Sequence, residues 1–398
     1  MNDPIVIVGA ARTPMGAFQG DFSALTASDL GAVAIKAAVE RAGLKPEQVD
    51  AVLFGNVLQA GQGQAPARQA TIKAGLPVAT NAATISKVCG SAMQATMFAF
   101  DSLLAGTNEV VVAGGMESMT NAPYLIPKGR SGYRIGHATI FDHMMLDGLE
   151  DAYSKGDNGG GRSMGTFGEE CAAKYHFSRA DQDAFAIASV QRAQAATADG
   201  SFKWEIAPVT VTSRAGEVVI DKDEGPQKAK LDKIPSLRAA FKKDGTITAA
   251  SSSSINDGAA ALVLMRESTA KKLGCTPIAR ILGHASHSQE PEWFTTAPVG
   301  AIEKLYKKVG WSGADVDLYE VNEAFAVVPM AAMKEHNIPH DKINVHGGAC
   351  ALGHPIGASG ARIIVTLLGA LKAKGGKRGV ASLCIGGGEG TAIAVELV

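Results

Sequence analysis

Short apolar runs alternate along the chain with longer stretches in which apolar residues recur every three or four positions. PIVIVGA at 4–10 is followed by LGAVAIKAAVERAG at 30–43, and then by VDAVLFGNV at 49–57. Short runs rich in valine and isoleucine are typical of buried strands, whereas the longer periodic stretches are typical of helices that pack on a sheet. This alternation predicts an α/β fold with mainly parallel strands.

The chain also contains an internal repeat. Two segments resemble each other, AIKAAVERAGLKPEQVDAVLFGNV at 34–57 and AIEKLYKKVGWSGADVDLYEVNEA at 301–324. Gly43 and Gly310 lie 267 positions apart, and the same offset relates Gly90 to Gly357. Because a repeat of this length is a duplicated domain and not a solenoid unit, we predict two similar α/β halves that pack as a pseudo-dimer.

The region between the two halves has a different character. Residues 221–245, DKDEGPQKAKLDKIPSLRAAFKKDG, are charged and irregular, and the apolar pattern resumes after them. We therefore predict an N-terminal half, an inserted loop domain that rests on it, and a C-terminal half. Their boundaries are residues 1–120 plus 249–272, residues 121–248, and residues 273–398.

The composition argues against several classes of protein. The 398 residues are 46% hydrophobic and carry a formal net charge of −1, whereas a nucleic-acid-binding protein usually has a basic excess. No apolar run approaches the roughly 18 residues of a membrane span, and we find no secretory leader. We expect a cytoplasmic protein that binds neither nucleic acid nor membrane.

The cysteines are few and scattered. Their odd number in a chain of this length predicts a reducing compartment and no disulfide framework. No pair has metal-ligand spacing, and the nine histidines form no HExxH cluster, so we expect no zinc site. The five cysteines are Cys89, Cys171, Cys275, Cys350 and Cys384.

Cys89 is the first candidate for chemistry. It lies in SKVCGSAMQ, between a short predicted strand and the start of a helix. Free amides at a helix N-terminus favour an anion, so we expect a lowered pKa and a nucleophilic thiolate. The alternative is a buried, inert cysteine, which is the commoner fate of an isolated one. The small residues Gly90 and Ser91 leave room for a substrate and favour the functional interpretation.

His354 occupies in the second half the place that Cys89 occupies in the first. It lies in GGACALGHPIGASG, before a helix of small residues. If the halves pack about a pseudo-twofold axis, both helix N-termini face one cleft and form a Cys–His pair. The alternative is a histidine that merely caps the helix, but the surrounding glycines favour close backbone approach.

Two strand ends carry further candidates. Cys384 lies in LCIGGGEG, where a thiol could serve as acid or base and the glycine N–H groups could form an oxyanion hole. Asn322 and Glu323 lie in YEVNEAF, where an amide could hold a water or a developing oxyanion. Taken alone, each is also compatible with an ordinary glycine turn or a polar strand end.

At these motifs the chain resembles the thiolase family. The matching segments occur in family order and span almost the whole chain. They are GNVLQAGQGQAPARQA, VCGSAMQ, VAGGMESMTNAPY, INDGAAALVLM, VNEAFA, GGACALGHPIGASGAR and LCIGGGEG. The resemblance implies two duplicated α/β halves in an αβαβα layered sandwich with an inserted loop domain, which agrees with the repeat.

Within that family the chain is most similar to the acetyl-CoA acetyltransferases. This implies the reversible Claisen condensation of two acetyl-CoA to acetoacetyl-CoA and CoA through an acetyl-cysteine, in fatty acid metabolism. It also implies a homo-oligomer, either a tetramer or a dimer. Acyl-CoA substrates and CoA would be the ligands, and no metal or redox cofactor would be needed.

The resemblance also implies a role for each matching residue. Cys89 would be acylated after activation by His354, and Cys384 would remove or return the α-proton. Asn322 would fix a water that forms one oxyanion hole with His354, and the N–H groups of Cys89 and Gly386 would form the other. The pantetheine and acyl groups would be bordered by Met164, Ser253, Ala324 and Phe325.

The chain departs from the family at the pocket and not at the nucleophile. Ala92 stands where the family usually has glycine, Ser163 where many members have histidine, and Ser251–Ser254 where a CoA-contacting turn is expected. Acyl-chain preference therefore stays open, with a longer-chain 3-ketoacyl-CoA thiolase as the alternative.

A carrier-protein synthase usually has a second histidine in place of Asn322. A non-catalytic acyl-CoA or lipid-binding module would need no nucleophile, and a nicotinamide oxidoreductase would need a GxGxxG after the first strand.

Overall fold

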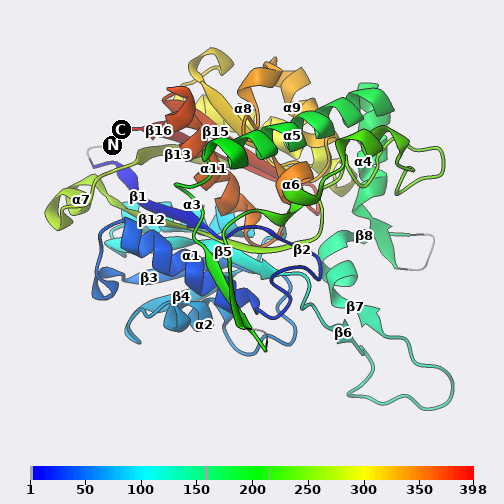
Figure 1. Ribbon diagram of the computed structural model, residues 1–398, viewed down its shortest axis with the longest axis horizontal. Coiled ribbons are helices and arrows are strands. Elements are labelled where there is room, and N and C mark those ends of the chain that lie inside the picture. Colours follow the sequence, from blue (N-terminus) through cyan, green and yellow to red (C-terminus); the bar gives the residue numbers. More distant parts are fainter. Residues whose placement is uncertain (1–2, 157–159, 215) are drawn as a thin grey trace.

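The computed structural model describes residues 3–156, 160–214 and 216–398 (Figure 1). Its first half alternates strands and helices, as the apolar pattern predicts. The elements are β1 (Ile5–Arg12), β2 (Gly16–Ala17), α1 (Ala27–Arg41), β3 (Ala51–Gly55), α2 (Pro66–Lys73), β4 (Asn81–Ile85), α3 (Ser91–Leu104), β5 (Val110–Ser118) and, after the insertion, β12 (Asn256–Arg266) and α7 (Glu267–Leu273).

The second half repeats this order, which confirms the duplication. The elements are β13 (Ala279–Ser288), α8 (Ala297–Val309), β14 (Leu318–Val321), α9 (Val327–His336), α10 (Ala349–Leu352), α11 (Ser359–Lys374), β15 (Arg378–Ile385) and β16 (Glu389–Leu397). The backbone repeats even at the turns. Gly43, just after α1, and Gly310, just after α8, have φ of 70° and 72°. Both positions need the left-handed conformation that glycine adopts most easily.

The strands of the two halves form one continuous sheet in the order β14-β15-β16-β13-β1-β12-β5-β3-β4, and β2 pairs with β12 beside this path. The two halves join where Ile5–Ile7 of β1 pairs with Ala279–Ile281 of β13. The prediction of mainly parallel strands is wrong, because only β3–β4, β3–β5 and β14–β15 are parallel pairs among the described residues. A three-residue glycine turn joins β15 to β16, and so short a link allows only antiparallel pairing.

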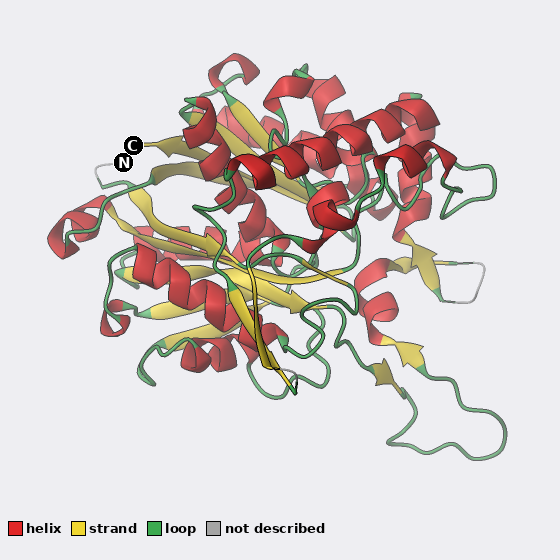
Figure 2. Cartoon of the chain, in the orientation of Figure 1, coloured by secondary structure: helices red, strands yellow, loops and turns green. Residues whose placement is uncertain are grey.

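The helices and strands stack in five layers, as the resemblance implies (Figure 2). Helices α3 and α11 lie in the middle, where Met93 and Ile364 share one core with strand residues of both halves. Helix α1 covers the outer face of the first half, and α8 covers that of the second. Ser359–Leu371 of α11 are all buried, as expected for a helix enclosed on every side.

The insertion lies between the end of β5 at Ser118 and the start of β12 at Asn256. It was expected to rest on the first half, but α4 and α5 pack largely on the second. Phe167 of α4 belongs to the core of α8 and α9, and Ser189 of α5 bonds Glu323. Its elements are β6 (Tyr124–Leu125), β7 (Phe141–Asp142), β8 (Glu150–Lys155), β9 (Gly161–Ser163), α4 (Met164–Tyr175), α5 (Arg179–Asp199), β10 (Val209–Ser213), β11 (Gly216–Ile220) and α6 (Glu224–Lys228).

Candidate active site

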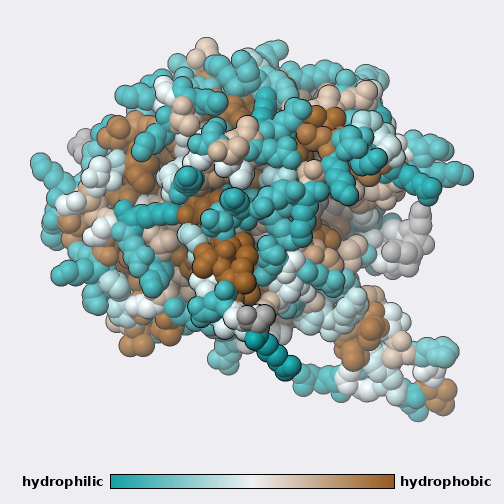
Figure 3. All heavy atoms as spheres, viewed as in Figure 1, coloured by the Kyte–Doolittle hydropathy of each residue, from teal (hydrophilic) through white to brown (hydrophobic). Residues whose placement is uncertain are grey.

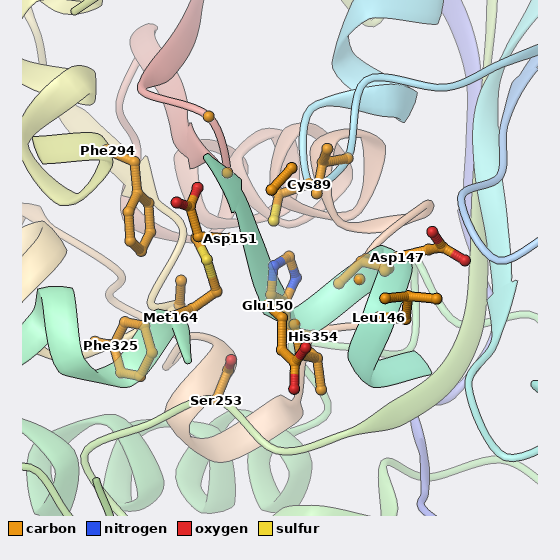
Figure 4. Close-up of a pocket in the computed structure, with 18 of the residues that line it drawn as sticks. Cys89, Leu146, Asp147, Glu150, Asp151, Met164, Ser253, Phe294, Phe325 and His354 are labelled. Carbon is orange, nitrogen blue, oxygen red and sulfur yellow. The ribbon is translucent and has the colours of Figure 1, made fainter. Parts of the chain in front are cut away.

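A cavity of about 260 Å³ opens where the loops of both halves meet the insertion (Figure 4). Of the nine predicted site residues, seven line it. They are Cys89, His354, Gly386, Met164, Ser253, Ala324 and Phe325. The sequence therefore predicted most of a site whose members come from six separate segments of the chain.

Cys89 lies in a tight turn between β4 and α3. The preceding residue, Val88, has φ of 46°, a left-handed conformation that is costly for a β-branched side chain. Ser91 supports the turn, because its hydroxyl donates to the Val88 carbonyl at 2.6 Å and accepts from the Lys87 amide at 2.8 Å. A Cβ on Gly90 would collide with the Ile385 side chain. The turn thus presents the thiol to the cavity.

The thiol is not the ready thiolate that the sequence predicts. Burial raises the pKa of Cys89 to about 11, although the N–H groups of Gly386 and of Cys89 itself lower it. The carboxylate of Glu117 adds to the rise. Desolvation therefore outweighs the start of α3 and favours the neutral thiol. The same two N–H groups reach the sulfur, so they lie beside the position where the carbonyl oxygen of an attacked thioester would become an oxyanion.

The hydrogen bonds of His354 identify its tautomer. Ser359 donates its one hydroxyl proton to the Pro355 carbonyl at 2.9 Å, so its oxygen accepts from His354 Nδ1 at 2.5 Å. The proton is therefore on Nδ1, and Nε2 keeps its lone pair. Burial, and next the charge of Arg362, lower the pKa of His354 to about 3. His354 is thus a neutral base whose Nε2 can accept a proton.

The loops that carry Cys89 and His354 are exchanged between the halves. The loop with Cys89 lies against Ile385 and Gly386 at the end of β15, in the second half. The loop with His354 lies on the first half, where the Gly357 amide donates to Glu117 at 3.0 Å. The Gly357 carbonyl packs so closely on Gly55 that a Cβ there would lie 2.5 Å from it. This exchange brings both helix N-termini to one cavity, as the repeat predicts.

Cys384 and Asn322 are fully buried and lie behind the lining. Burial raises the pKa of Cys384 far above its usual value, and a charge on Cys89 raises it further. This effect of a charge on Cys89 places Cys384 near it in the structure. Asn322 Nδ2 lies 3.5 Å from His354 Nε2.

A second cavity of about 260 Å³ adjoins the first and shares five of the predicted residues with it. The shared residues are Met164, Ser253, Ala324, Phe325 and His354. Phe241 and the Ser252–Ser254 turn form its outer part, so the serines that replace the expected family turn lie at the site. Together the two cavities give room for a long, flexible ligand on both sides of Met164.

The sequence analysis missed several residues of the site. Asp151, Tyr153 and Phe294 line the main cavity, and the short segment Met145–Leu149 forms a wall. Their local sequence has no pattern that would bring them here. Ser359 was detectable in principle, because it follows His354 by five residues at the start of a helix.

The described residues hold neither a metal-ligand cluster nor a helix suited to a membrane. Outside positions 1–2, 157–159 and 215, no three His, Cys, Asp or Glu side chains cluster as metal ligands would. Across the same described ranges, none of the helices combines the length and apolar character needed to cross a bilayer.

Comparison with known proteins gives the family. The N-terminal thiolase domain matches residues 5–268, and the C-terminal thiolase domain matches residues 275–397. Acetyl-CoA acetyltransferase 1 of Arabidopsis thaliana is 51% identical, with 99% of this chain and 94% of that protein covered. Acetyl-CoA acetyltransferase of Chromobacterium violaceum is 49% identical, with 98% and 99% covered.

Solved structures agree. The Bacillus anthracis acetyl-CoA acetyltransferase superposes with a TM-score of 0.95 at 40% identity, over 100% of this chain and 99% of that one. The Acat5 thiolase of Ascaris suum, solved in complex with coenzyme A, gives 0.92 at 40% identity, over 99% and 100%. With both family domains matched in order and the Cys89 and His354 loops converging on one cavity, this chain belongs to the thiolase family.

Proposed function

We propose that the protein is an acetyl-CoA C-acetyltransferase, which condenses two acetyl-CoA to acetoacetyl-CoA and CoA and also runs in reverse. The observation that carries this proposal is the cavity lined by Cys89 and His354, with the Gly386 amide at the sulfur. The relatives in Arabidopsis and Chromobacterium carry that activity in their names. The reaction would serve fatty acid metabolism.

In the first half-reaction, Cys89 attacks the thioester carbonyl of acetyl-CoA while His354 Nε2 takes the thiol proton. The N–H groups of Cys89 and Gly386 stabilise the oxyanion, and each such donor is worth roughly 2.7–4 kcal/mol. The CoA thiolate leaves as the carbonyl re-forms, and it takes the proton of Cys384. The products are acetyl-Cys89, free CoA, a protonated His354 and the thiolate of Cys384.

In the second half-reaction, the Cys384 thiolate removes an α-proton from a second acetyl-CoA. Protonated His354, with a water held by Asn322, stabilises the enolate oxygen. The carbanion attacks the acetyl group, and the departing Cys89 sulfur recovers its proton from His354. Acetoacetyl-CoA leaves, and every proton is back on its starting atom.

Steady-state rates test the proposal and its acyl preference together. We expect thiolysis of acetoacetyl-CoA by the wild-type protein, and no measurable thiolysis by Cys89→Ala. We expect kcat/KM to fall from acetoacetyl-CoA to 3-ketohexanoyl-CoA and to longer substrates. The opposite order would assign the protein to the longer-chain thiolases, and no thiolysis of any 3-ketoacyl-CoA would contradict the proposal.

The chemistry needs a base and two oxyanion holes, so we propose that the protein uses no metal or redox cofactor, with CoA entering as part of substrate and product. Met164, Ser253, Ala324 and Phe325 would hold the pantetheine and acyl groups. We place the enzyme in the cytoplasm. Full thiolysis after dialysis against EDTA is the expected result, and activity that returns only with an added metal would contradict it.

We also propose a homo-oligomer, either a dimer or a tetramer. The loop between β6 and β7 projects from the body of the molecule and carries apolar residues on its surface (Figure 3). Ile126, Ile135 and Ile140 are among its exposed side chains. Such a projection suits a contact with a second copy. Light scattering should give a multiple of the chain mass, and Ile135→Asp should lower it.

A further inference from the structure

We infer that Arg362 is a positioning residue for the condensation step: it fixes the amide of Asn322 so that the NH₂ group faces His354 and the substrate oxygen. This inference rests on the proposed function, and it adds a residue that the family motifs do not assign to the site. Arg362 lies on α11, three residues after Ser359, and is fully buried.

The guanidinium contacts two residues at the end of β14. Nη1 donates to Glu320 Oε2 at 3.5 Å, and Nη2 donates to Asn322 Oδ1 at 3.4 Å. Glu320 and Asn322 are two positions apart, so their side chains leave the extended chain on the same face. The planar guanidinium presents separate N–H groups to Glu320 and Asn322 at the same time. The single ammonium of a lysine has no such fixed, paired donors.

The chemistry of arginine settles which way the Asn322 amide points. A guanidinium has donors and no acceptor, so the atom of Asn322 that faces it must be the carbonyl oxygen. The NH₂ group then faces the opposite way, where Nδ2 lies 3.5 Å from His354 Nε2. A reversed amide would place its NH₂ against the guanidinium and its oxygen at the imidazole. Arg362 therefore selects the orientation that a water or an enolate oxygen needs.

The contacts also argue against a purely stabilising ion pair. The contact with Glu320 is long and involves a single oxygen, and within the described chain Arg362 Nε and Glu320 Oε1 lack hydrogen-bond partners. Buried pairs with unsatisfied atoms contribute little to stability. Burial raises the pKa of Glu320 to about 8 even though the charge of Arg362 lowers it, so the carboxyl is largely protonated at neutral pH and pairs weakly. The arginine is better explained by what it does to Asn322.

The test uses Arg362→Lys, which keeps the charge but not the fork. We expect acetylation of Cys89 by acetyl-CoA at close to the wild-type rate, and condensation slowed about tenfold to a hundredfold with little change in KM. Arg280→Lys, at an exposed pair with Glu267, is the matched control and should leave both steps unchanged. In an Asn322→Ala background, Arg362→Lys should cause no further loss, because the amide it orients is gone.

Condensation at the wild-type rate in Arg362→Lys would overturn the inference. A further fall in the condensation rate when Arg362→Lys is added to Asn322→Ala would overturn it as well. If Arg362→Lys does not fold, Asn322→Asp is the second variant, because it keeps an oxygen toward Arg362 and lacks the N–H. It should acetylate Cys89 and fail to condense, and normal condensation would be decisive against the inference. A wild-type protein that makes no acetoacetyl-CoA would instead contradict the proposed function.

Discussion

At the scale of single residues, the resting site consists of neutral partners. Cys89 is a thiol with a pKa of about 11, and His354 is an imidazole with a pKa of about 3. Both shifts come chiefly from burial, which disfavours a charge on either group. In the proposed mechanism the nucleophile is therefore generated during the reaction, when the thiol proton moves to Nε2, and is not stored as an ion pair.

This predicts the pH dependence of Cys89 alkylation in the empty enzyme. Iodoacetamide reacts with the thiolate, so its rate should rise about tenfold per pH unit between about pH 7 and pH 10, because the folded pKa lies above that range. Mass spectrometry of the Cys89 peptide, with Cys89→Ala as control, gives the rate. A rate that is already constant near neutral pH would indicate a thiolate–imidazolium pair and contradict this picture.

The sequence predicted the site residues better than it predicted their electrostatics. Cys89, His354 and Gly386 do line one cavity, because their motifs stand at strand ends and helix starts that the repeat relates. The lowered pKa expected for Cys89 was wrong, because a helix start is visible in a sequence and the burial that opposes it is not. Phe294 and Asp151 lie at the site through tertiary packing alone, which left no local pattern to detect.

At the scale of elements, the exchange of the two loops is what assembles the site. The His354 loop fits the first half because the strands beneath it, β3 and β5, have glycine at the points of closest approach. The Gly357 carbonyl lies against Gly115 so closely that a Cβ would collide with it. The carboxylate of Glu117 then accepts from the Gly357 amide and fixes the loop.

Gly115→Ala should therefore damage both stability and catalysis. The added methyl meets backbone on a buried strand, and such overpacking typically costs about 1–3 kcal/mol. Because the displaced loop carries His354, kcat for thiolysis should fall as well. Gly313→Ala is the control, since its nearest contacts would lie at 3.7 Å and involve no site residue. Urea unfolding and thiolysis rates measure both effects, and wild-type values for Gly115→Ala would contradict the loop exchange.

At the scale of the whole molecule, a buried charge network ties the insertion to the first half. Arg12 of β1 is fully buried and donates to Glu205 at 2.5 Å and to Asp223 at 2.6 and 2.9 Å. Glu205 also accepts from Thr366 of α11, so the network reaches the central helix layer. The insertion is thus held against both halves near the helix that carries Arg362.

Arg12→Gln should lower the free energy of unfolding by about 3–5 kcal/mol, because it leaves two buried carboxylates without their cation. Lys307→Gln removes an exposed partner of Glu303 and should leave the urea midpoint unchanged. For each variant, unfolding followed by circular dichroism and unfolding followed by tryptophan fluorescence should give the same midpoint. Equal midpoints for Arg12→Gln and the wild-type protein would show that the network does not hold the insertion.

The architecture was largely predictable from the sequence, and the strand directions were not. The duplicated halves and the insertion follow from the offset between Gly43 and Gly310 and from the charged stretch at 221–245. Apolar runs give the presence of strands but not their direction, so β12 and β16 were not recognised as antiparallel. The packing of α4 and α5 on the second half depends on contacts such as that of Ser189 with Glu323. These contacts join positions far apart in the chain, so no local pattern predicts them.

We propose that Cys89 and Cys384 divide the reaction between them, and the Cys384→Ala variant tests this most directly. Cys384→Ala is incubated with acetyl-CoA, and the intact protein and its peptides are analysed by mass spectrometry, together with an assay for acetoacetyl-CoA. We predict one acetyl group on Cys89 and no acetoacetyl-CoA. An unmodified Cys89, or acetoacetyl-CoA formed at the wild-type rate, would contradict the account.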